Sequence, residues 1–468
     1  MNNNTKRFII SAAVISMLSL AACGNTEDSS AQDTSATTAA AVSQTETSAD
    51  ESSTAETVTT TTAAAESVEP AENVYSQAEE SITEETAVQT ANVGISDIEI
   101  LEAAADNTAL SSGNATVTIG GKQIDLSGAY IIDGIDAEIT GGTYTSSESD
   151  QNVFLVINGG SLKISNAKIV KTGDASTNDS QRSHDVSDDY NFYGINSVVL
   201  VVGEGSSAEI TDCTVTSDSS GANTVFSTAG ALADVRNVQI NTTGNSSRGV
   251  YATYEGTINA DHVDITTSGA HCAPIATDRG GGYVTVTNST VQCSGDGSPC
   301  IYSTGEIKVE NVVGVSTGAQ AAVIEGKNSI TMTDCDFTVS GGNNGVMLYQ
   351  SMSGDAADKD ATSSCSTLSM SGTTIRNNTD GAMFYITNTT SAIDLNGGNT
   401  LECANGQLVN ATAGRWGRDG LNGGSLSLNI TGDSISDSVT ADDISSVAVN
   451  VLDGGEFTGE TFGEVMVG

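Results

Sequence analysis

Basic residues are scarce in this chain, and acidic residues are abundant. Only 16 of its 468 residues are Lys or Arg, against 59 Asp or Glu, which gives a formal net charge of −43. A chain with this balance repels the phosphates of nucleic acids and of anionic membrane surfaces. The charge therefore argues against both as partners and leaves cations, neutral glycans and basic proteins.

Cysteine pairs in metal-binding spacings are also missing. The chain has eight cysteines, and the seven after Cys23 contain no Cys-x-x-Cys and no Cys/His spacing typical of zinc sites. An odd number of cysteines does not favour a disulfide framework either. We expect most of them to be small side chains buried in a core.

The apolar run near the N-terminus is too short to span a membrane. Lys6 and Arg7 precede an apolar run from Phe8 to Leu20, whereas a spanning helix needs about 20 apolar residues. A basic start followed by an apolar run and small residues is the layout of an export signal. Residues 1–22 are therefore predicted to be a signal peptide that is removed after export.

The end of this signal, Leu20-Ala21-Ala22-Cys23, resembles the lipobox of bacterial lipoproteins. The resemblance implies cleavage before Cys23 and diacylation of its side chain, and two acyl chains suffice for stable anchoring. The alternative is an ordinary signal peptide that is cleaved without lipidation. With the lipid, the protein is expected at the extracellular face of the cell membrane.

Residues 23–92 are expected to form a tether without fixed structure. They are dominated by Ser, Thr, Ala and Glu, and no Lys or Arg occurs between Arg7 and Lys122. Such a segment cannot bury enough apolar surface to offset the entropy of ordering, and its like charges repel one another. It would hold a folded head away from the membrane.

From about Asn114 onward the chain repeats itself. Short polar residues or glycines interrupt an apolar alternation at intervals of about 24 residues, lengthened at three places by insertions. These anchor positions are Gly141, Asn166, Asp212, Asn237, His262, Asn288, Asn311, Asp334, Gly372, Gly397 and Gly432. Apolar residues stand four and two positions before most anchors, which indicates strands of period two, and the anchors themselves favour a left-handed turn.

A third strand completes each repeat. It is marked by Val225, Tyr251, Ile275, Ile301, Val323, Met347 and Met383. Three short strands and three bends in about 24 residues describe one coil of a parallel β-helix, in which equivalent residues of successive coils stack about 4.8 Å apart. The prediction is an all-β, right-handed parallel β-helix over residues 114–468, preceded by a cap at residues 93–113 in which Ser96 to Glu99 has the form of a capping box for a short helix.

The stretches "SRGVYATYEGTI", "ATDRGGGYVTVTNSTV" and "SPCIYSTGEIKV" resemble those of pectate-lyase-like parallel β-helix proteins, in particular the lipobox-bearing, tethered surface proteins of bacteria. "VIEGKNSITMTD" and "VMLYQSMSGD" add to this resemblance, which covers the chain from about Asn114 to its end. The resemblance implies the fold. It does not imply an activity, because this fold hosts lyases, hydrolases, adhesins and stalks.

One corner of the predicted coil gathers functional side chains. The stretch Asp278-Arg279-Gly280-Gly281-Gly282 falls on this corner, and no helix follows that would make it a phosphate cradle. The candidate ligand-binding residues at the corner and on the insertion after Ala411 are Asp278, Arg279, Glu325, Lys327, Tyr349, Gln350, Tyr385, Arg415 and Trp416. Rings beside charged and amide groups suit sugars, although acids and bases on adjacent coils could equally neutralise one another.

A second candidate site lies on the insertion at residues 172–194. It carries Asp185, Asp188 and Asp189, and closely spaced carboxylates are what Ca²⁺ requires. A solvated loop without any ion is the alternative. Calcium is the one cofactor that the sequence suggests.

These features predict a monomeric, membrane-anchored surface lipoprotein whose head binds an extracellular glycan or a surface protein. A polysaccharide lyase or glycoside hydrolase is the alternative, although the Trp-Ile-Asp-His, Arg-x-Pro-x-x-Arg and Gly-His-Gly signatures of such enzymes are absent. A purely structural spacer is the second alternative. No residue is assigned a catalytic role.

Overall fold

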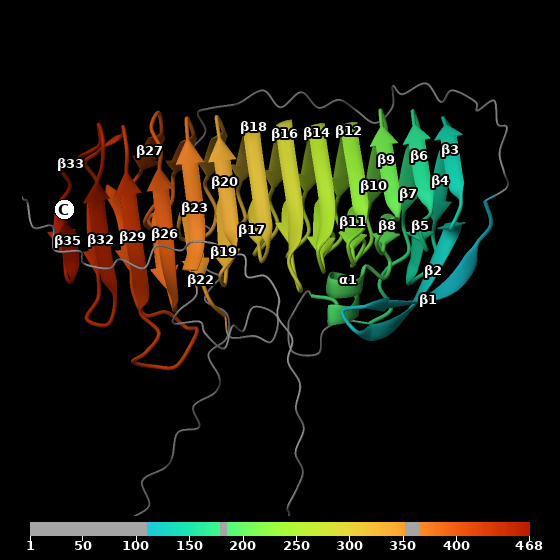
Figure 1. Ribbon diagram of the computed structural model, residues 1–468, viewed down its shortest axis with the longest axis horizontal. Coiled ribbons are helices and arrows are strands. Elements are labelled where there is room, and N and C mark those ends of the chain that lie inside the picture. Colours follow the sequence, from blue (N-terminus) through green and yellow to red (C-terminus); the bar gives the residue numbers. More distant parts are fainter. Residues whose placement is uncertain (1–109, 178–184, 352–364) are drawn as a thin grey trace, which may run out of the picture. The chain divides into compact units, whose positions relative to one another are not determined.

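The computed structural model describes residues 110–177, 185–351 and 365–468. The predicted signal peptide, the tether and nearly all of the predicted cap lie outside these ranges. The described residues form an all-β parallel β-solenoid of about 13 turns with about 25 residues per turn. The predicted fold class is therefore confirmed, and Figure 1 shows the strands stacked side by side in chain order.

Two long sheets run the length of the solenoid. Sheet A has 14 strands: β1 (Gly113–Ile119), β2 (Lys122–Asp133), β5 (Gln151–Ile157), β8 (Val199–Val202), β11 (Val225–Thr228), β13 (Val250–Thr253), β15 (Ile275–Thr277), β17 (Ile301–Ser303), β19 (Ala322–Glu325), β22 (Val346–Tyr349), β25 (Phe384–Thr387), β28 (Gln407–Ala411), β31 (Ser438–Ala441) and β34 (Thr461–Phe462). All its pairings are parallel except that of β1 with β2, so an antiparallel hairpin covers the edge of the first coil.

Sheet B has 19 strands and contains the strand segments on both sides of every anchor residue except Gly432, after which β30 belongs to a separate pair. They are β3 (Asp136–Thr140), β4 (Thr143–Ser146), β6 (Ser161–Ser165), β7 (Lys168–Lys171), β9 (Ser207–Thr211), β10 (Thr214–Ser217), β12 (Leu232–Thr242), β14 (Gly256–Thr267), β16 (Gly282–Cys293), β18 (Glu306–Ser316), β20 (Ser329–Thr333), β21 (Asp336–Val339), β23 (Cys365–Ser371), β24 (Thr374–Asn377), β26 (Thr389–Leu395), β27 (Thr400–Cys403), β29 (Gly424–Ile430), β32 (Ser446–Val451) and β35 (Val465–Val467). Strands β30 (Ser434–Ile435) and β33 (Glu456–Phe457) form a separate pair.

Every predicted anchor adopts the left-handed conformation. The backbone φ lies between 51° and 87° at all eleven anchors, from Gly141 to Gly432. Asparagine tolerates this conformation better than other residues with a Cβ, and its amide can also bridge coils. Asn311 donates such a bond to Asn288 over 2.8 Å. The anchors therefore form a polar ladder on the outside of sheet B.

The predicted third strand exists, but its marker residues do not share one face. Val225, Ile275 and Ile301 point into the main core, whereas Tyr251 pairs with Phe226 and Ala276 in a column that points outward. Val323 and Met347 belong to the outward column as well. The single alignment of these residues was wrong, because a shift of one residue moves a strand side chain to the opposite face of the sheet.

The outer face of sheet A is itself covered near the N-terminal end. The insertion between β7 and β8 contains the only helix of the described residues, α1 (Asp188–Tyr193), whose residues Phe192 and Tyr193 pack with the outward side chains Leu200, Phe226 and Tyr251. The β1–β2 hairpin adds Ile124 and Leu126 to this second apolar cluster. In Figure 1 the hairpin and α1 lie together at the lower edge of the first coils.

The glycines after Asp278 are corner residues, as the sequence predicted. Gly280 and Gly281 have φ values of 77° and 71°, and strand β16 rather than a helix begins at Gly282. A Cβ on Gly280 would meet the Tyr254 ring at 2.4 Å. The glycine therefore meets both a backbone and a packing requirement.

Candidate functional site

Two columns of side chains stand on the outer face of sheet A and begin under α1. We call the first the aromatic column; it comprises Phe226, Tyr251, Ala276, Tyr302, Val323, Met347 and Tyr385. The second, two residues further along each strand, is the carboxylate column. It comprises Thr253, Asp278, Thr304, Glu325, Tyr349 and Thr387. This assignment follows from the same strand pairings, continued one or two residues beyond the ends of the paired segments where necessary. Asp278 and Glu325 thus lie on the same face, two coils apart.

Asp278 is enclosed by groups from neighbouring coils. Only 8 % of its surface is exposed; the Tyr251 hydroxyl donates to its Oδ2 over 2.8 Å, and the Arg279 backbone N–H donates to its Oδ1 over 2.9 Å. The Arg248 guanidinium lies 4.7 Å from the centre of the Tyr251 ring. Burial raises the pKa of the Asp278 carboxyl above its usual range, although Arg248 and the Tyr251 phenol act in the opposite direction.

Glu325 accepts two phenol hydrogen bonds on one carboxylate oxygen. The hydroxyls of Tyr302 and Tyr349 both donate to its Oε2, the latter over 2.7 Å. Its other oxygen, Oε1, is buried and has no hydrogen-bond partner. Glu325 as a whole is 4 % exposed. Burial is the largest cause that raises the pKa of Tyr302 and of Tyr349 well above the usual range, and the nearby charge of Glu325 is the second. Both phenols therefore stay protonated.

Further unsatisfied oxygens occupy the same column. The hydroxyl oxygens of Thr304 and Thr387 are buried, and neither makes a hydrogen bond. Each lies one coil from a group already described, Thr304 next to Glu325 and Thr387 next to Tyr349. Buried polar atoms without partners cost free energy in a native protein and are uncommon. Three of them therefore stand in one column.

The insertion between β28 and β29 brings Trp416 to this place. Its ring centre lies 4.6 Å from that of Tyr349 with the planes tilted by 51°, and the Arg415 guanidinium lies 4.4 Å from the centre of the Trp416 ring. Asn422 holds the loop by donating its side-chain N–H groups to the carbonyls of Gly414 and Trp416. The indole is therefore positioned by its own loop and by the Tyr349 ring.

The remaining predicted ligand residues lie at varying distances from these columns. Arg279 turns toward α1, where its guanidinium lies 4.0 Å from the Phe192 ring centre, and Lys327 is exposed at the corner. Gln350 is buried directly after Tyr349, and Tyr385 stands in the aromatic column. Sequence reasoning missed Arg248, Tyr251 as a partner of Asp278, and Tyr302. Tyr302 stands two residues before Thr304, so a period-two alignment of this strand could have placed it on the same face.

The three aspartates of the predicted calcium site face different partners. Asp185 is buried and accepts hydrogen bonds from the Ser246 hydroxyl over 2.6 Å and from Asn191, which ties the insertion to the coils. Asp189 pairs with Lys122 of the hairpin, and Asp188 is exposed. Within the described ranges, no group of three His, Cys, Asp or Glu side chains is arranged to hold a metal ion.

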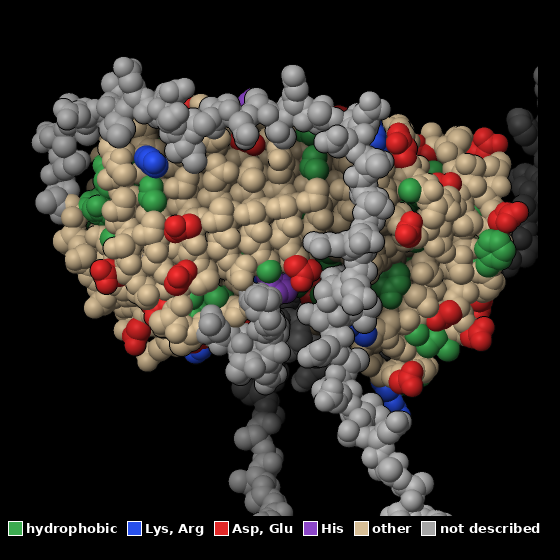
Figure 2. Space-filling model, turned by 180° about the vertical axis from the view of Figure 1, so that it is seen from behind, with side chains coloured by type: hydrophobic (Ala, Val, Ile, Leu, Met, Phe, Trp, Pro, Cys, Tyr) green, Lys and Arg blue, Asp and Glu red, His purple; other side chains and the backbone are tan. Residues whose placement is uncertain are grey.

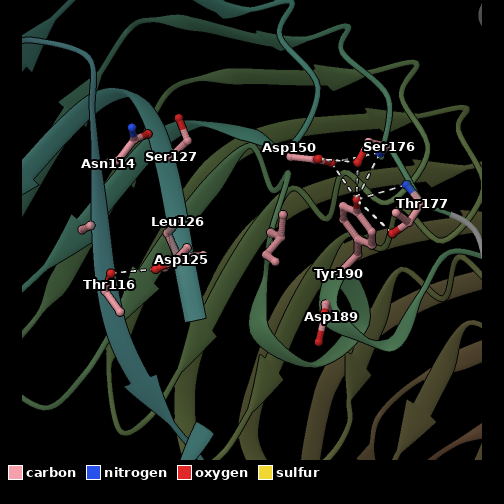
Figure 3. A pocket seen from close by; sticks show the side chains of 12 residues that line it. Asn114, Thr116, Asp125, Leu126, Ser127, Asp150, Ser176, Thr177, Asp189 and Tyr190 are labelled. Carbon is pink, nitrogen blue, oxygen red and sulfur yellow. Dashed lines mark hydrogen bonds between the residues drawn. The ribbon is translucent and has the colours of Figure 1, made fainter. Parts of the chain in front are cut away.

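Asp189 also lines a cavity between the β1–β2 hairpin and the insertion, which Figure 3 shows. The cavity has a volume of about 610 Å³, and its lining includes the carboxylates of Asp125, Asp150 and Asp189. Asp150 is fully engaged: the Tyr190 hydroxyl donates to its Oδ1 over 2.6 Å, and Ser176 donates its backbone N–H over 2.9 Å. These bonds lower the pKa of Asp150 although burial raises it, so the carboxylate supports the insertion.

No family model, no curated protein and no solved structure matches this chain. In the ranges that the structure describes, no helix is both long enough and apolar enough to cross a membrane.

Proposed function

We propose that this protein is a lipid-anchored surface protein whose solenoid binds an extracellular polysaccharide along the outer face of sheet A. The observation that carries the proposal is the carboxylate column, with its buried Glu325 Oε1 and the Thr304 and Thr387 hydroxyls that lack partners. Sugar hydroxyls donate and accept hydrogen bonds and would complete these groups. The Trp416 and Tyr349 rings offer apolar surface for a sugar face.

The charge of the chain narrows the class of polysaccharide. With a formal net charge of −43 and two carboxylates in the column, the protein repels uronates and sulfated sugars. Neutral polysaccharides are therefore the expected ligands. On the face of the molecule that Figure 2 shows, carboxylates are scattered and basic groups are few.

Binding can be measured by a glycan array followed by affinity electrophoresis in gels that contain the best polysaccharide. Trp416→Ala is expected to weaken binding by about two- to tenfold through lost stacking, and Glu325→Gln by about tenfold through loss of a charged acceptor. Glu310→Gln is the matched control, because Glu310 is an exposed carboxylate on β18 of sheet B. Equal retardation of all three variants, or no binding to any glycan, contradicts the proposal and leaves the structural spacer.

One observation favours an enzyme as the second candidate. The raised pKa of Asp278 is a property of a general acid, and a second carboxylate, Glu325, stands on the same face. A glycoside hydrolase would release reducing ends from the bound polysaccharide, and Asp278→Asn would abolish the release. Binding without product from the wild-type protein would exclude this candidate.

The anchor is tested separately from the head. Lipidation of Cys23 predicts that a radiolabelled fatty acid is incorporated in growing cells and that the protein fractionates with membranes. Cys23→Ser is expected to abolish both, while the glycan affinity of the purified head stays unchanged. Incorporation of label into the Cys23→Ser variant would contradict the lipobox assignment.

A further inference from the structure

Two buried thiols face each other inside one coil. Cys293 is the last residue of β16, Cys300 directly precedes β17, and their sulfur atoms lie 3.6 Å apart. Cys293 is 3 % exposed and Cys300 is fully buried, both within the main core. Six residues of a tight turn separate them.

In the coils on either side, the position of Cys293 carries a hydroxyl. In the adjacent coils the same column holds Thr242, Thr267 and Ser316. Their hydroxyls donate to carbonyls of the following turn over 2.7, 2.6 and 2.8 Å, respectively. A thiol is a much weaker donor, so the turn after Cys293 lacks the hydrogen bond that its neighbours share.

In the two coils before and the one after, the position of Cys300 holds Gly249, Pro274 and Ala321, none of which has a polar side-chain atom. The backbone carbonyls of Gly249, Pro274, Cys300 and Ala321 accept successive hydrogen bonds from the strands of the preceding coils. Cys300 alone among these four has a reactive group. Both departures from their columns therefore occur in the same coil, and they place the two reactive groups in contact.

From this coincidence we infer that Cys293 and Cys300 form a disulfide in the exported protein. The inference depends on export, which is part of the proposed function, because disulfides persist in oxidising compartments. For the bond to form, the sulfurs must approach from 3.6 Å to about 2 Å. The bond replaces the missing hydroxyl-to-carbonyl bond as the closure of this turn.

The chemistry requires an external acceptor. Each thiol loses its proton, the pair loses two electrons as the S–S bond forms, and a disulfide-bearing oxidoreductase or oxidised glutathione is reduced to thiols in exchange. Because both sulfurs are buried, the exchange takes place before this coil closes. The resulting bond fixes the coil that carries Tyr302 and Thr304, two members of the proposed ligand face.

The test is a peptide map of the full chain, exported by a bacterial host and denatured in iodoacetamide without reductant. Trypsin releases residues 280–308, from Gly280 after Arg279 to Lys308, with Cys293 and Cys300 as its only cysteines. We expect this peptide to be lighter by two hydrogens and to take up no reagent until it is reduced. Cys213 and Cys335 are buried free thiols in the structure, as Cys293 and Cys300 are. Their peptides are the internal control and should be alkylated.

A second measurement separates the bond from the export. Protein refolded in oxidised glutathione should form the same peptide link, and reduction should lower its Tm by several degrees. The variant Cys293→Ser/Cys300→Ala restores the residue types of the neighbouring coils, so it should fold and lose the part of the Tm response to reductant that this bond causes. If both cysteines are alkylated in the refolded protein, the disulfide inference is overturned. If they are alkylated only in the exported protein, the proposed export to an oxidising compartment is overturned instead.

Discussion

The two long sheets are both built mainly of parallel strands from successive coils, but they differ in what covers their outer faces. Sheet B alternates between buried and exposed residues, as in β16, where Val284 is buried and Tyr283 is 50 % exposed. In sheet A, strands β8, β11 and β13 are buried on both faces. Side chains that point away from the solenoid are therefore solvated on sheet B and form a second core on sheet A. That second core continues into the columns proposed to bind a ligand.

The largest effect is expected for an outward aromatic residue of the second core. Phe226→Ala should lower the free energy of unfolding by about 3–5 kcal/mol, because Phe226 is fully buried and packs at 4.8 Å against the Tyr251 ring. Tyr283→Ala on sheet B should change it by less than about 0.5 kcal/mol. Urea denaturation of both variants gives the comparison, and equal losses would mean that the outer faces do not differ.

Removing a buried charge on sheet A should likewise cost more stability than removing an exposed charge on sheet B. Arg248→Ala leaves Asp278 and Asp185 without their guanidinium partner under the covering insertion, and about 3 kcal/mol of stability should be lost. On sheet B, Arg376 pairs with Asp336 and Glu402 near the solvent, so Arg376→Ala should cost at most about 1 kcal/mol. The difference in urea midpoint between these variants, measured at neutral pH, tests the prediction.

A lysine enclosed within the coils provides a pH-dependent contrast to Arg248. Lys171 is fully buried, and burial lowers its pKa to about 8 from 10.5, while its ammonium group donates to the carbonyls of Glu148 and Gly173. Between these two pKa values the unfolded chain binds a proton that the folded chain does not, so this group makes stability rise with pH there. Below about 8 its contribution is flat.

Urea titrations of the wild type and of Lys171→Met across this window isolate the effect. Their difference in free energy of unfolding should shift by about 1–3 kcal/mol in favour of the wild type as the pH rises. A constant difference at all pH values would show that Lys171 titrates normally in the folded protein.

The smallest effect concerns the polar ladder of sheet B. Asn288 has a φ of 51°, donates to Asp261 over 2.8 Å and accepts from Asn311. Asn288→Ala should cost about 1–2 kcal/mol, mainly through the left-handed backbone. Asn288→Gly should recover most of this loss. Thermal unfolding distinguishes the two, and equal losses would assign the cost to the ladder hydrogen bonds instead.

Much of the fold was predictable because it depends on local chemistry. All eleven anchors could be read from the sequence, since only residues that tolerate a left-handed turn recur there. Strand faces in sheet B followed from alternation. The same method failed for sheet A, because neighbouring residues such as Val250 and Tyr251 point to opposite faces and are both apolar. Without polar and apolar alternation, the sequence does not show which residue faces inward.

The candidate site was predictable only in part for a related reason. Asp278, Glu325 and Tyr349 were placed on one face from their spacing, and they do share a column. Arg248 and Tyr302 were missed, since their contacts depend on side-chain direction. The contact between Trp416 and Tyr349 depends on the path of an insertion, which no repeat encodes.

The sequence alone determined that the chain winds into stacked coils, because the turn residues and the apolar period are local and recur in every repeat. Only the tertiary structure decided which oxygens lack partners, which cation lies beside Asp278 and which two thiols meet. The phenol contacts of Asp278 and Glu325 join residues 24 to 27 positions apart in the chain. The two thiols are only seven positions apart, but they meet across a turn whose path is fixed by packing against the neighbouring coils.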